Sequence, residues 1–317
     1  MERSQMRYLT PEIDRFFLEE DKMAFIAGPR QVGKTTLAKH LLAQVHAEAF
    51  YFNWDIESHR KAIIKSPEDF WQGSAPIPGR PKPRLCLDEI HKYPRWKRFL
   101  KGLYDAKGKD LEILVIREDL RDLTRIREIG LVESLITLLP ERIGSPLSVN
   151  ALREDLGVNF MTVQAWLDAL ERLYFLFRIR PYAGRLARTL RREEKVYLFD
   201  PSAIENEGAK FENLVALHLR KLCDAWTDWG YGDFNLFYVR DREKREVDFL
   251  ITDRHKVYAL IECKLRADGI DSSLRYFSER LKPKYAVQVM REPEKGKSIS
   301  VFDEILAVPA TVFLSLI

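Results

Sequence analysis

A nine-residue stretch near the N-terminus limits what this chain can fold into more than any other feature. It fits the spacing G-x-x-x-x-G-K-[ST] of a phosphate-binding loop and consists of Gly28, Pro29, Arg30, Gln31, Val32, Gly33, Lys34, Thr35 and Thr36. The apolar residues 23–27 before it predict a buried parallel strand, and residues 35–45 after it repeat leucines at helical spacing. The alternative is a glycine-rich turn with a chance lysine, but such a turn would not need a strand before it and a helix after it. The stretch therefore predicts a nucleotide site where a strand meets a helix.

The residue types in and beyond this loop predict ATP hydrolysis with Mg²⁺. Lys34 would contact the β- and γ-phosphates of ATP, and the Thr35 hydroxyl would bind Mg²⁺. A second apolar strand, residues 84–90, includes the adjacent carboxylates Asp88 and Glu89 at its end. Asp88 would hold Mg²⁺ through water, and Glu89 would orient or polarise the attacking water. Because strand residues alternate faces, we expect only one of the two carboxylates to point at the metal.

The composition is that of a globular protein with several domains. The 317 residues suffice for two or three domains, and the net charge of +4 permits nucleic-acid binding without demonstrating it. Cys86, Cys223 and Cys263 are odd in number, well separated and in apolar contexts, which predicts reduced core residues in a cytoplasmic protein. The sequence carries no signal pattern and no long apolar run, so we expect no membrane partner.

Strands and helices alternate in the first part of the chain, which predicts an α/β domain with a parallel sheet covered on both faces. The expected strands are residues 23–27, 49–54, 84–90 and 111–116, and the expected helices include 35–45 and 94–105. Residues 117–139 have a charged helical pattern without a strand. We therefore assign residues 1–139 to a P-loop ATPase domain.

The middle part, residues 140–205, predicts a winged helix. A helix closed by Gly157 and a second helix, 160–172, form a helix–turn–helix pattern, and strands at 174–181 and 196–199 would form the wing. A basic run suited to phosphate contacts lies between these helices and the end of the wing. We expect six arginines of this run to contact DNA, with Lys195 beside them: Arg178, Arg180, Arg185, Arg188, Arg191 and Arg192. The alternative is a spacer or protein-docking module with a solvated arginine-rich hairpin.

The last part, residues 206–317, predicts a smaller α/β domain of order α-β-β-β-α-β. This order would bring Asp248, Glu262 and Lys264 together with Glu212 from the preceding helix. Carboxylates near a lysine can bind Mg²⁺ and activate water for phosphodiester cleavage, in which Lys264 would position or deprotonate the water. Glu212 would support the metal. The alternative is a set of surface salt bridges, although unpaired charges in an apolar strand are costly.

Together these segments resemble prokaryotic AAA-like P-loop ATPases that carry a winged-helix middle and a C-terminal restriction-endonuclease-like domain. The resemblance covers nearly the whole chain and depends on five segments: Gly28–Thr36, Leu87–Ile90, Gly144–Ser148, Glu246–Phe249 and Glu262–Lys264. It implies ATP binding and hydrolysis, and a nuclease fold that in some members only binds DNA. By analogy with AAA-like ATPases, it also implies a homo-oligomer that completes its sites across subunits.

The chain departs from this family directly after the strand that ends at Ile116. In the family that strand leads into a polar sensor segment, followed by another strand and helices, whereas here Arg117 and a charged helix follow at once. Either the protein lacks part of its ATPase sheet or residues are missing from the sequence at this junction. We favour the second, since loss of a sheet strand would expose core. A trans-peptide Cα–Cα separation of about 3.8 Å between Ile116 and Arg117 would refute it.

Three functions are compatible with these patterns. The leading hypothesis is a DNA-binding protein that hydrolyses ATP and acts on branched or single-stranded DNA. The second is an Mg²⁺-dependent nuclease gated by ATP, with Asp248, Glu262 and Lys264 as its catalytic residues. The third is a nucleotide-switched signalling or scaffold ATPase that does not bind DNA.

Overall fold

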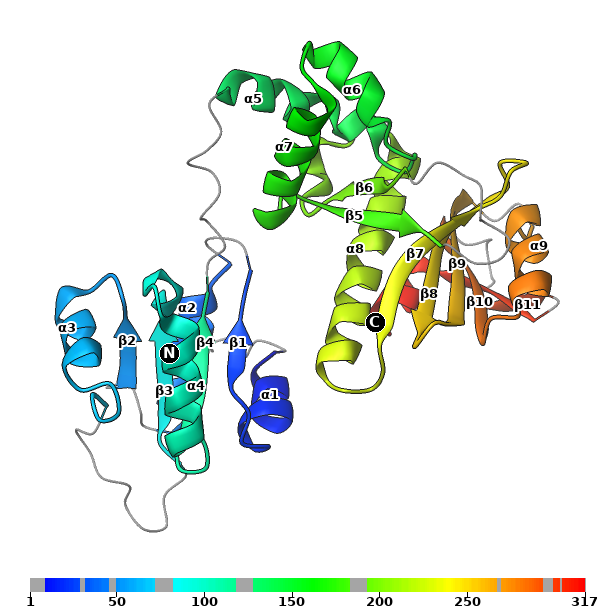
Figure 1. The fold of residues 1–317 in the computed structure, drawn as a ribbon. Coiled ribbons are helices and arrows are strands. Elements are labelled where there is room, and N and C mark those ends of the chain that lie inside the picture. Colours follow the sequence, from blue (N-terminus) through cyan, green and yellow to red (C-terminus); the bar gives the residue numbers. More distant parts are fainter. Residues whose placement is uncertain are drawn as a thin grey trace, which may run out of the picture. The chain divides into compact units, whose positions relative to one another are not determined.

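The chain divides into two compact units, Met1–Arg121 and Asp122–Ile317, in a computed structural model (Figure 1). The structure describes residues 9–28, 32–45, 50–71, 82–117, 128–182, 193–266, 269–292, 299–302 and 304–316. In this part of the chain, no helix is both long and apolar enough to cross a membrane.

The first unit is built on a four-stranded parallel sheet. Its strands are β1 (Ala24–Ile26), β2 (Tyr51–Asn53), β3 (Arg84–Asp88) and β4 (Glu112–Ile116), in the order β1-β4-β3-β2. The helices are α1 (Leu9–Ile13), a π-helical turn (Asp14–Leu18), α2 (Lys34–Ala43), α3 (Glu57–Lys65), a 3₁₀ turn (Ile90–Lys92) and α4 (Trp96–Lys107). The predicted α/β class with a parallel N-terminal sheet is confirmed. Its central strand β3 is buried along its whole length, as expected of a parallel strand between helices.

One buried arginine connects the layers of the first unit. Arg84, at the start of β3, donates from Nη1 to the carbonyl oxygen of Leu41 at 2.9 Å and from Nε to Glu112 Oε2 at 2.7 Å. Its Nη2 also pairs with Asp14 Oδ1 at 2.8 Å. These partners come from α2, β4 and the π-helical turn, so this side chain holds three elements around the sheet. Its charge is tolerated in the core because these partners satisfy the guanidinium group.

Strand β1 lies at the edge of this sheet, next to the junction where a missing segment was predicted. Phe25 in β1 is 51% exposed, and the Arg117 amide donates to the carbonyl oxygen of Ile26 at 3.1 Å. Residues 118–127 lie outside the described residues. A further strand beside β1 would cover Phe25, so the edge is compatible with a lost or missing segment, which stays a prediction.

The second unit begins with helices. These are α5 (Ile129–Leu138), a 3₁₀ turn (Pro140–Arg142), α6 (Val149–Leu156) and α7 (Phe160–Arg172). The predicted helix–turn–helix pattern has clear local causes. The Ser148 and Asn159 side chains cap the first turns of α6 and α7, and Gly157 ends α6 with a positive φ of 66°. That left-handed conformation favours glycine, which explains why the turn occurs there.

An eight-stranded sheet forms the rest of the second unit. Its order is β11-β12-β10-β9-β8-β7-β5-β6, and the bounds are β5 (Leu176–Pro181), β6 (Lys195–Leu198), β7 (Phe234–Arg240), β8 (Glu246–Asp253), β9 (Lys256–Arg266), β10 (Tyr285–Glu292), β11 (Ser300–Phe302) and β12 (Ile305–Pro309). The α-β-β-β-α-β order corresponds to α8 (Glu207–Asp228), β7, β8, β9, α9 (Ser272–Leu281) and β10. Strands β11 and β12 and helix α10 (Ala310–Ser315) follow them and were not predicted.

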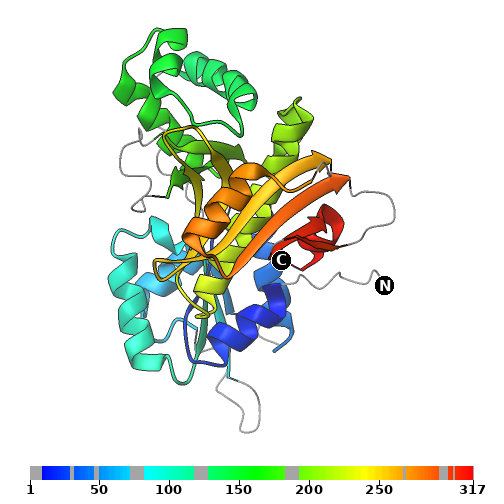
Figure 2. The ribbon, with the colours of Figure 1, turned by 90° about the vertical axis from the view of Figure 1, so that its right-hand side faces the viewer.

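The hairpin of β5 and β6 is continuous with this sheet. Strand β5 pairs with β7 in parallel and with β6 in antiparallel orientation. Helices α8 and α9 pack on opposite faces of the sheet (Figure 2). Phe249 in β8 belongs to the core that contains α8, and its neighbour Leu250 belongs to the core that contains α9. The boundary proposed at 205/206 therefore runs through one continuous sheet.

Candidate functional site

The first candidate site lies where β1 and β3 end and α2 begins. Lys34 Nζ donates to the carbonyl oxygen of Gly28 at 2.9 Å, so the lysine side chain folds back along the loop that precedes it. Gly33, the N-cap of α2, has φ 79° and ψ 30°, a left-handed conformation that favours glycine. The loop residues Pro29, Arg30 and Gln31 lie outside the described residues. The exposed Val32 and the first turn of α2, with Lys34, Thr35 and Thr36, complete the stretch.

The carboxylate predicted to hold Mg²⁺ lies beside the predicted hydroxyl ligand. Thr35 Oγ1 donates to Asp88 Oδ2 at 3.2 Å, and the Tyr51 hydroxyl donates to the same oxygen from β2. Burial and the hydrogen bond to Asp88 raise the pKa of Tyr51, so this phenol stays a proton donor. The Thr35 hydroxyl in the first turn of α2 and the Asp88 carboxylate at the end of β3 fit a magnesium ion that keeps several of its water ligands. The tyrosine was not predicted, because its hydrogen bond to Asp88 depends on the pairing of β2 with β3, which sets Tyr51 opposite Cys86 and Asn53 opposite Asp88.

Glu89 follows the last residue of β3 and contacts other partners than this pair does. Its backbone is left-handed, with φ 59° and ψ 15°, an uncommon conformation for a residue other than glycine. Its Oε2 pairs with Lys92 Nζ at 2.9 Å and lies 3.7 Å from Nε2 of His91. Lys92 Nζ also contacts Asp55 Oδ2 at 2.5 Å. Glu89, the residue predicted to orient the attacking water, is thus held in an ion pair with Lys92.

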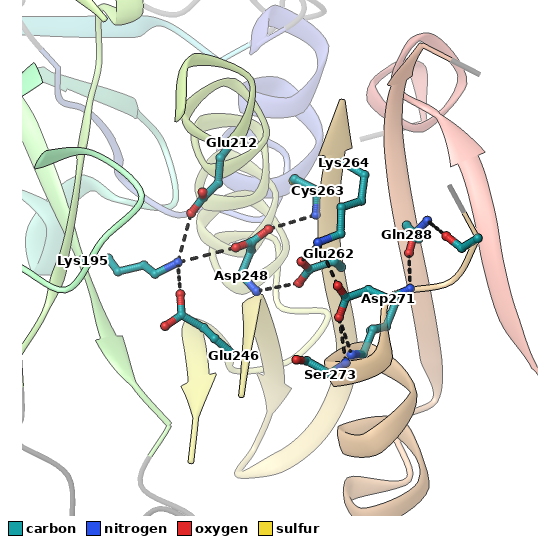
Figure 3. A network of polar contacts seen from close by, with 12 residues as sticks. Lys195, Glu212, Glu246, Asp248, Glu262, Cys263, Lys264, Asp271, Ser273 and Gln288 are labelled. Atoms are coloured by element: carbon teal, nitrogen blue, oxygen red, sulfur yellow. Dashed lines mark hydrogen bonds and ion pairs between the residues drawn. The ribbon is translucent and has the colours of Figure 1, made fainter. Parts of the chain in front are cut away.

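The second candidate site is a buried polar network in the second unit (Figure 3). It contains all four residues that the sequence grouped together, Glu212, Asp248, Glu262 and Lys264. It also contains Lys195, Tyr197, Glu246, Asp271 and Gln288, which were not predicted as site residues. Most of the network is not at the surface as the alternative of surface salt bridges requires, because Glu262 is 6% exposed and the Lys195 side chain is fully buried.

Lys195 is the centre of this network. Its Nζ lies 3.1 Å from Glu212 Oε1, 2.7 Å from Glu246 Oε1 and 3.6 Å from Asp248 Oδ1. Burial of this side chain opposes its charge, but the three carboxylates outweigh burial and raise the pKa of Lys195, so it stays protonated. The prediction that Lys195 belongs to a basic, phosphate-contacting wing is therefore wrong. The pairing of β6 with β5, and of β5 with β7, brings this lysine into the interior of the unit.

The other half of the network is formed by β8, β9 and the start of α9. Asp248 accepts a hydrogen bond from the Cys263 amide at 2.9 Å, and its own amide donates to Glu262 Oε2 at 3.2 Å. Lys264 Nζ pairs with Glu262 Oε1 at 2.9 Å and with Asp271 Oδ2 at 2.8 Å. The structure therefore brings Glu262 and Lys264 together, and Lys264 lies between the carboxyl groups of Glu262 and Asp271.

The segment Gly144–Ser148 lies next to two parts of this network, Glu212 and the start of β6. A Cβ atom at Gly144 would lie 2.8 Å from Glu212 Oε2, and Gly144 has a φ of 80°. Both facts favour glycine. The Leu147 amide also donates to the carbonyl oxygen of Glu194 at 2.8 Å, next to Lys195. This segment, singled out in the sequence only by resemblance, thus supports both Glu212 and the strand that carries Lys195.

Burial shifts the titration of the carboxylates in this network. It raises the pKa of Glu212 to about 7, with a contribution from the charge on Asp248 that Lys195 opposes. It raises the pKa of Glu262 to about 8, again with Asp248 contributing and Lys264 opposing. The pKa of Asp248 is also raised by burial. The two glutamates therefore keep protons near neutral pH, which limits the negative charge in the core.

We expect the second unit to lose stability as the pH rises between the ordinary glutamate pKa of 4.5 and about 8. In that range the folded glutamates keep protons that the unfolded chain releases, and a folded state that binds more protons is weakened by rising pH. Hydrogen exchange of peptides from α8 and β9 at several pH values measures this. Glu262→Gln should flatten the dependence, whereas the exposed Glu279→Gln on α9 should leave it unchanged. Stability that rises with pH in the unmodified chain would contradict the prediction.

The arginines predicted to contact DNA have different surroundings. Arg178 is 17% exposed and pairs with Asp168 at 2.7 Å and Glu194 at 3.4 Å, in addition to Glu171. Arg180 is 78% exposed and pairs at the surface with Glu194. Arg185, Arg188, Arg191 and Arg192 lie outside the described residues. A cavity of about 320 Å³ beside Arg178 and Arg180 also contains Glu171, Glu194 and Asp224, so its charges are mixed.

Three stretches match known protein families. Residues 20–122 match a family described as an AAA domain. Residues 109–206 match a domain of unknown function, DUF8612, and residues 207–311 match another, DUF4143. No curated protein and no solved structure matches the chain. The first unit therefore contains an AAA domain of the ATPase type, while the winged-helix and nuclease-like resemblances stay predictions. The network around Lys195 joins the two stretches of unknown function, because Lys195 belongs to the first and Glu212 to the second.

Proposed function

We propose that this chain is an ATPase whose turnover responds to DNA bound by its second unit. The arrangement of Lys34, Thr35 and Asp88 carries the first half of the proposal, since strand, loop and helix bring these side chains together in the way ATP hydrolysis requires. The AAA domain match covers the same residues.

At this site the chain's own residues would act mainly by positioning. The loop amides and Lys34 would bind the β- and γ-phosphates, and the Thr35 hydroxyl with Asp88 would hold Mg²⁺. When bound, Mg²⁺ neutralises negative charge on the β- and γ-phosphates. Tyr51 keeps the Asp88 carboxylate oriented by its hydrogen bond. Glu89 would orient the attacking water once its pair with Lys92 loosens.

The second half of the proposal depends on the helix–turn–helix and its hairpin. Helices α6 and α7 are followed by β5 and β6, which is the element order of a winged helix. Arg180 on the hairpin is exposed, and the connecting segment contains Arg185, Arg188, Arg191 and Arg192. Helix α7 has no lysine or arginine before its final residue, Arg172. We therefore expect the phosphate contacts to come from the hairpin and its connection rather than from α7.

A second candidate function is a nucleotide-switched ATPase that docks a protein. Two exposed apolar residues at the start of α7, Phe160 at 42% and Met161 at 73%, favour it. In a DNA-reading helix this turn faces base edges and phosphates, whereas a protein partner would cover the apolar surface. The ATP-gated nuclease is disfavoured by the ion pairs of Lys195, which engage the carboxylates that a catalytic metal would need.

We expect ATP turnover to rise when duplex, single-stranded or four-way-junction DNA is added, with Lys34→Ala as the blank. Replacing Arg185, Arg188, Arg191 and Arg192 by Ala should weaken DNA binding and reduce the salt slope by about one for each phosphate that is no longer neutralised. A matched control replaces Arg254, Arg275, Arg280 and Arg291 by Ala, which removes the same charge elsewhere. Turnover that stays flat with every form of DNA would refute the DNA half and favour the docking function.

A further inference from the structure

We propose that the Lys195 ammonium is the built-in cation of the nuclease-like site and excludes a divalent metal from it. The predicted Mg²⁺ ligands Glu212 and Asp248 both face Lys195 Nζ, at 3.1 and 3.6 Å, and Glu246 lies nearest at 2.7 Å (Figure 3). A metal bound by these oxygens would need the space that the ammonium occupies. The proposal does not depend on whether the second unit binds DNA.

The lysine is fixed in this position by its surroundings. Its side chain is fully buried, and the ring of Tyr238 lies 5.5 Å from its Nζ. The strand that carries it is held on both sides: the backbone of Lys195 bridges to Pro146, and β6 pairs with β5. A lysine on a mobile surface segment could leave when a metal arrives, but this one is part of a sheet.

Other oxygens and lone pairs of the carboxylates are also engaged. Glu212 Oε1 accepts from the Tyr197 hydroxyl at 2.6 Å, and Asp248 Oδ2 accepts from the Cys263 amide. Glu262 accepts from the Asp248 amide and pairs with Lys264. Mg²⁺ requires near-octahedral oxygen ligands at about 2.0–2.1 Å, and it would have to displace several of these bonds at once.

Three cations offset much of the negative charge without a metal. Lys195 contacts Glu212, Glu246 and Asp248, Arg240 pairs with Glu246 at 3.1 Å, and Lys264 pairs with Glu262 and Asp271. Among the described residues, no group of three or more His, Cys, Asp or Glu side chains is arranged to hold a metal ion. The predicted magnesium ligation by Glu212, Asp248 and Glu262 therefore does not fit this arrangement. In its place, an ion-paired core holds β6 against α8 and β8.

The inference has a gain-of-function consequence. If the ammonium is what keeps these carboxylates from closing on a metal, removing it should let them move together and form a metal site. Lys195→Met does this with little change in side-chain length. The background variant Asp88→Asn removes the carboxylate of the ATPase site, so that Mn²⁺ bound there does not obscure the result.

The experiment measures Mn²⁺ binding to the full chain by electron paramagnetic resonance and by the shift in thermal midpoint. In the Asp88→Asn background we expect no Mn²⁺ bound by the second unit at millimolar concentration. Adding Lys195→Met should create one Mn²⁺ site and a metal-dependent rise in the midpoint, and adding Asp248→Asn should abolish both.

Two outcomes would overturn the proposal. One is Mn²⁺ binding in the Asp88→Asn background that Asp248→Asn removes, because the ammonium would then not exclude the metal. The other is a folded Lys195→Met variant that gains no site. If that variant does not fold, Lys195→Met with Glu246→Gln removes one positive and one negative charge and keeps Glu212, Asp248 and Glu262. The same two outcomes, measured with this double variant, would then overturn the proposal.

Discussion

Replacing Lys34 by Ala is expected to reduce ATP turnover by about 10²- to 10³-fold, the usual cost of removing one preorganised donor to developing charge. Lys34 is only 7% exposed and its Nζ lies on the carbonyl oxygen of Gly28, so the ammonium group is held directly at the phosphate-binding loop. Phosphate release at saturating ATP measures the effect.

The control is Lys101→Ala on α4, which removes an exposed lysine of the same unit and should leave turnover unchanged. Glu89→Gln separates binding from chemistry, because it should retain nucleotide binding and lose hydrolysis. Turnover by Lys34→Ala within a few-fold of the unmodified chain would mean that the ATPase activity is not located at this loop.

Replacing Lys195 by Met is expected to destabilise the second unit by about 3–5 kcal/mol, the cost of leaving buried charges without their partner. Glu212, Glu246 and Asp248 would lose their shared cation, and all three have less than a quarter of their side chains exposed. Hydrogen exchange of peptides from α8 and β8 reports this unit separately from the ATPase unit.

Lys256→Met is the matched control, since Lys256 lies at the exposed start of β9. Adding Glu212→Gln to Lys195→Met should recover part of the lost stability, because it removes a carboxylate that has lost its ion pair, whereas Glu246 still pairs with Arg240 at 3.1 Å. Exchange rates in Lys195→Met equal to those of the unmodified chain would show that the network does not stabilise the fold.

The local structure at the candidate nucleotide site was largely predictable because most of it lies in two short stretches of sequence. Gly33 must adopt a left-handed conformation where α2 begins, and Lys34 and Thr35 follow it directly, so a short window of sequence contains the whole local structure. The adjacent pair Asp88 and Glu89 could be assigned by the same reasoning, because the end of a buried parallel strand is a local pattern. That only one of the two points at the metal stays a prediction: Asp88 accepts from Thr35, whereas Glu89 lies just beyond β3 with a left-handed backbone.

The second network was only half predictable. Glu262 and Lys264 share a strand face and could be grouped from spacing alone, and Asp248 followed from the order of strands. Lys195 could not be placed, because in sequence it is one more cation at the end of an arginine-rich run. The run predicts a solvated hairpin, and nothing in the local sequence indicates that the Lys195 side chain is buried.

The sequence by itself determined the α/β class, the phosphate-binding loop and the helix–turn–helix, because each depends on residue spacing and on conformations that glycine and capping residues impose locally. Only the tertiary structure decided that β5 and β6 extend the sheet of the last domain, that Gly144 lies against Glu212, and that Lys195 stands among three carboxylates. These contacts join residues far apart in the chain. They depend on which strands pair, and that is set by the burial of the whole core rather than by any short segment.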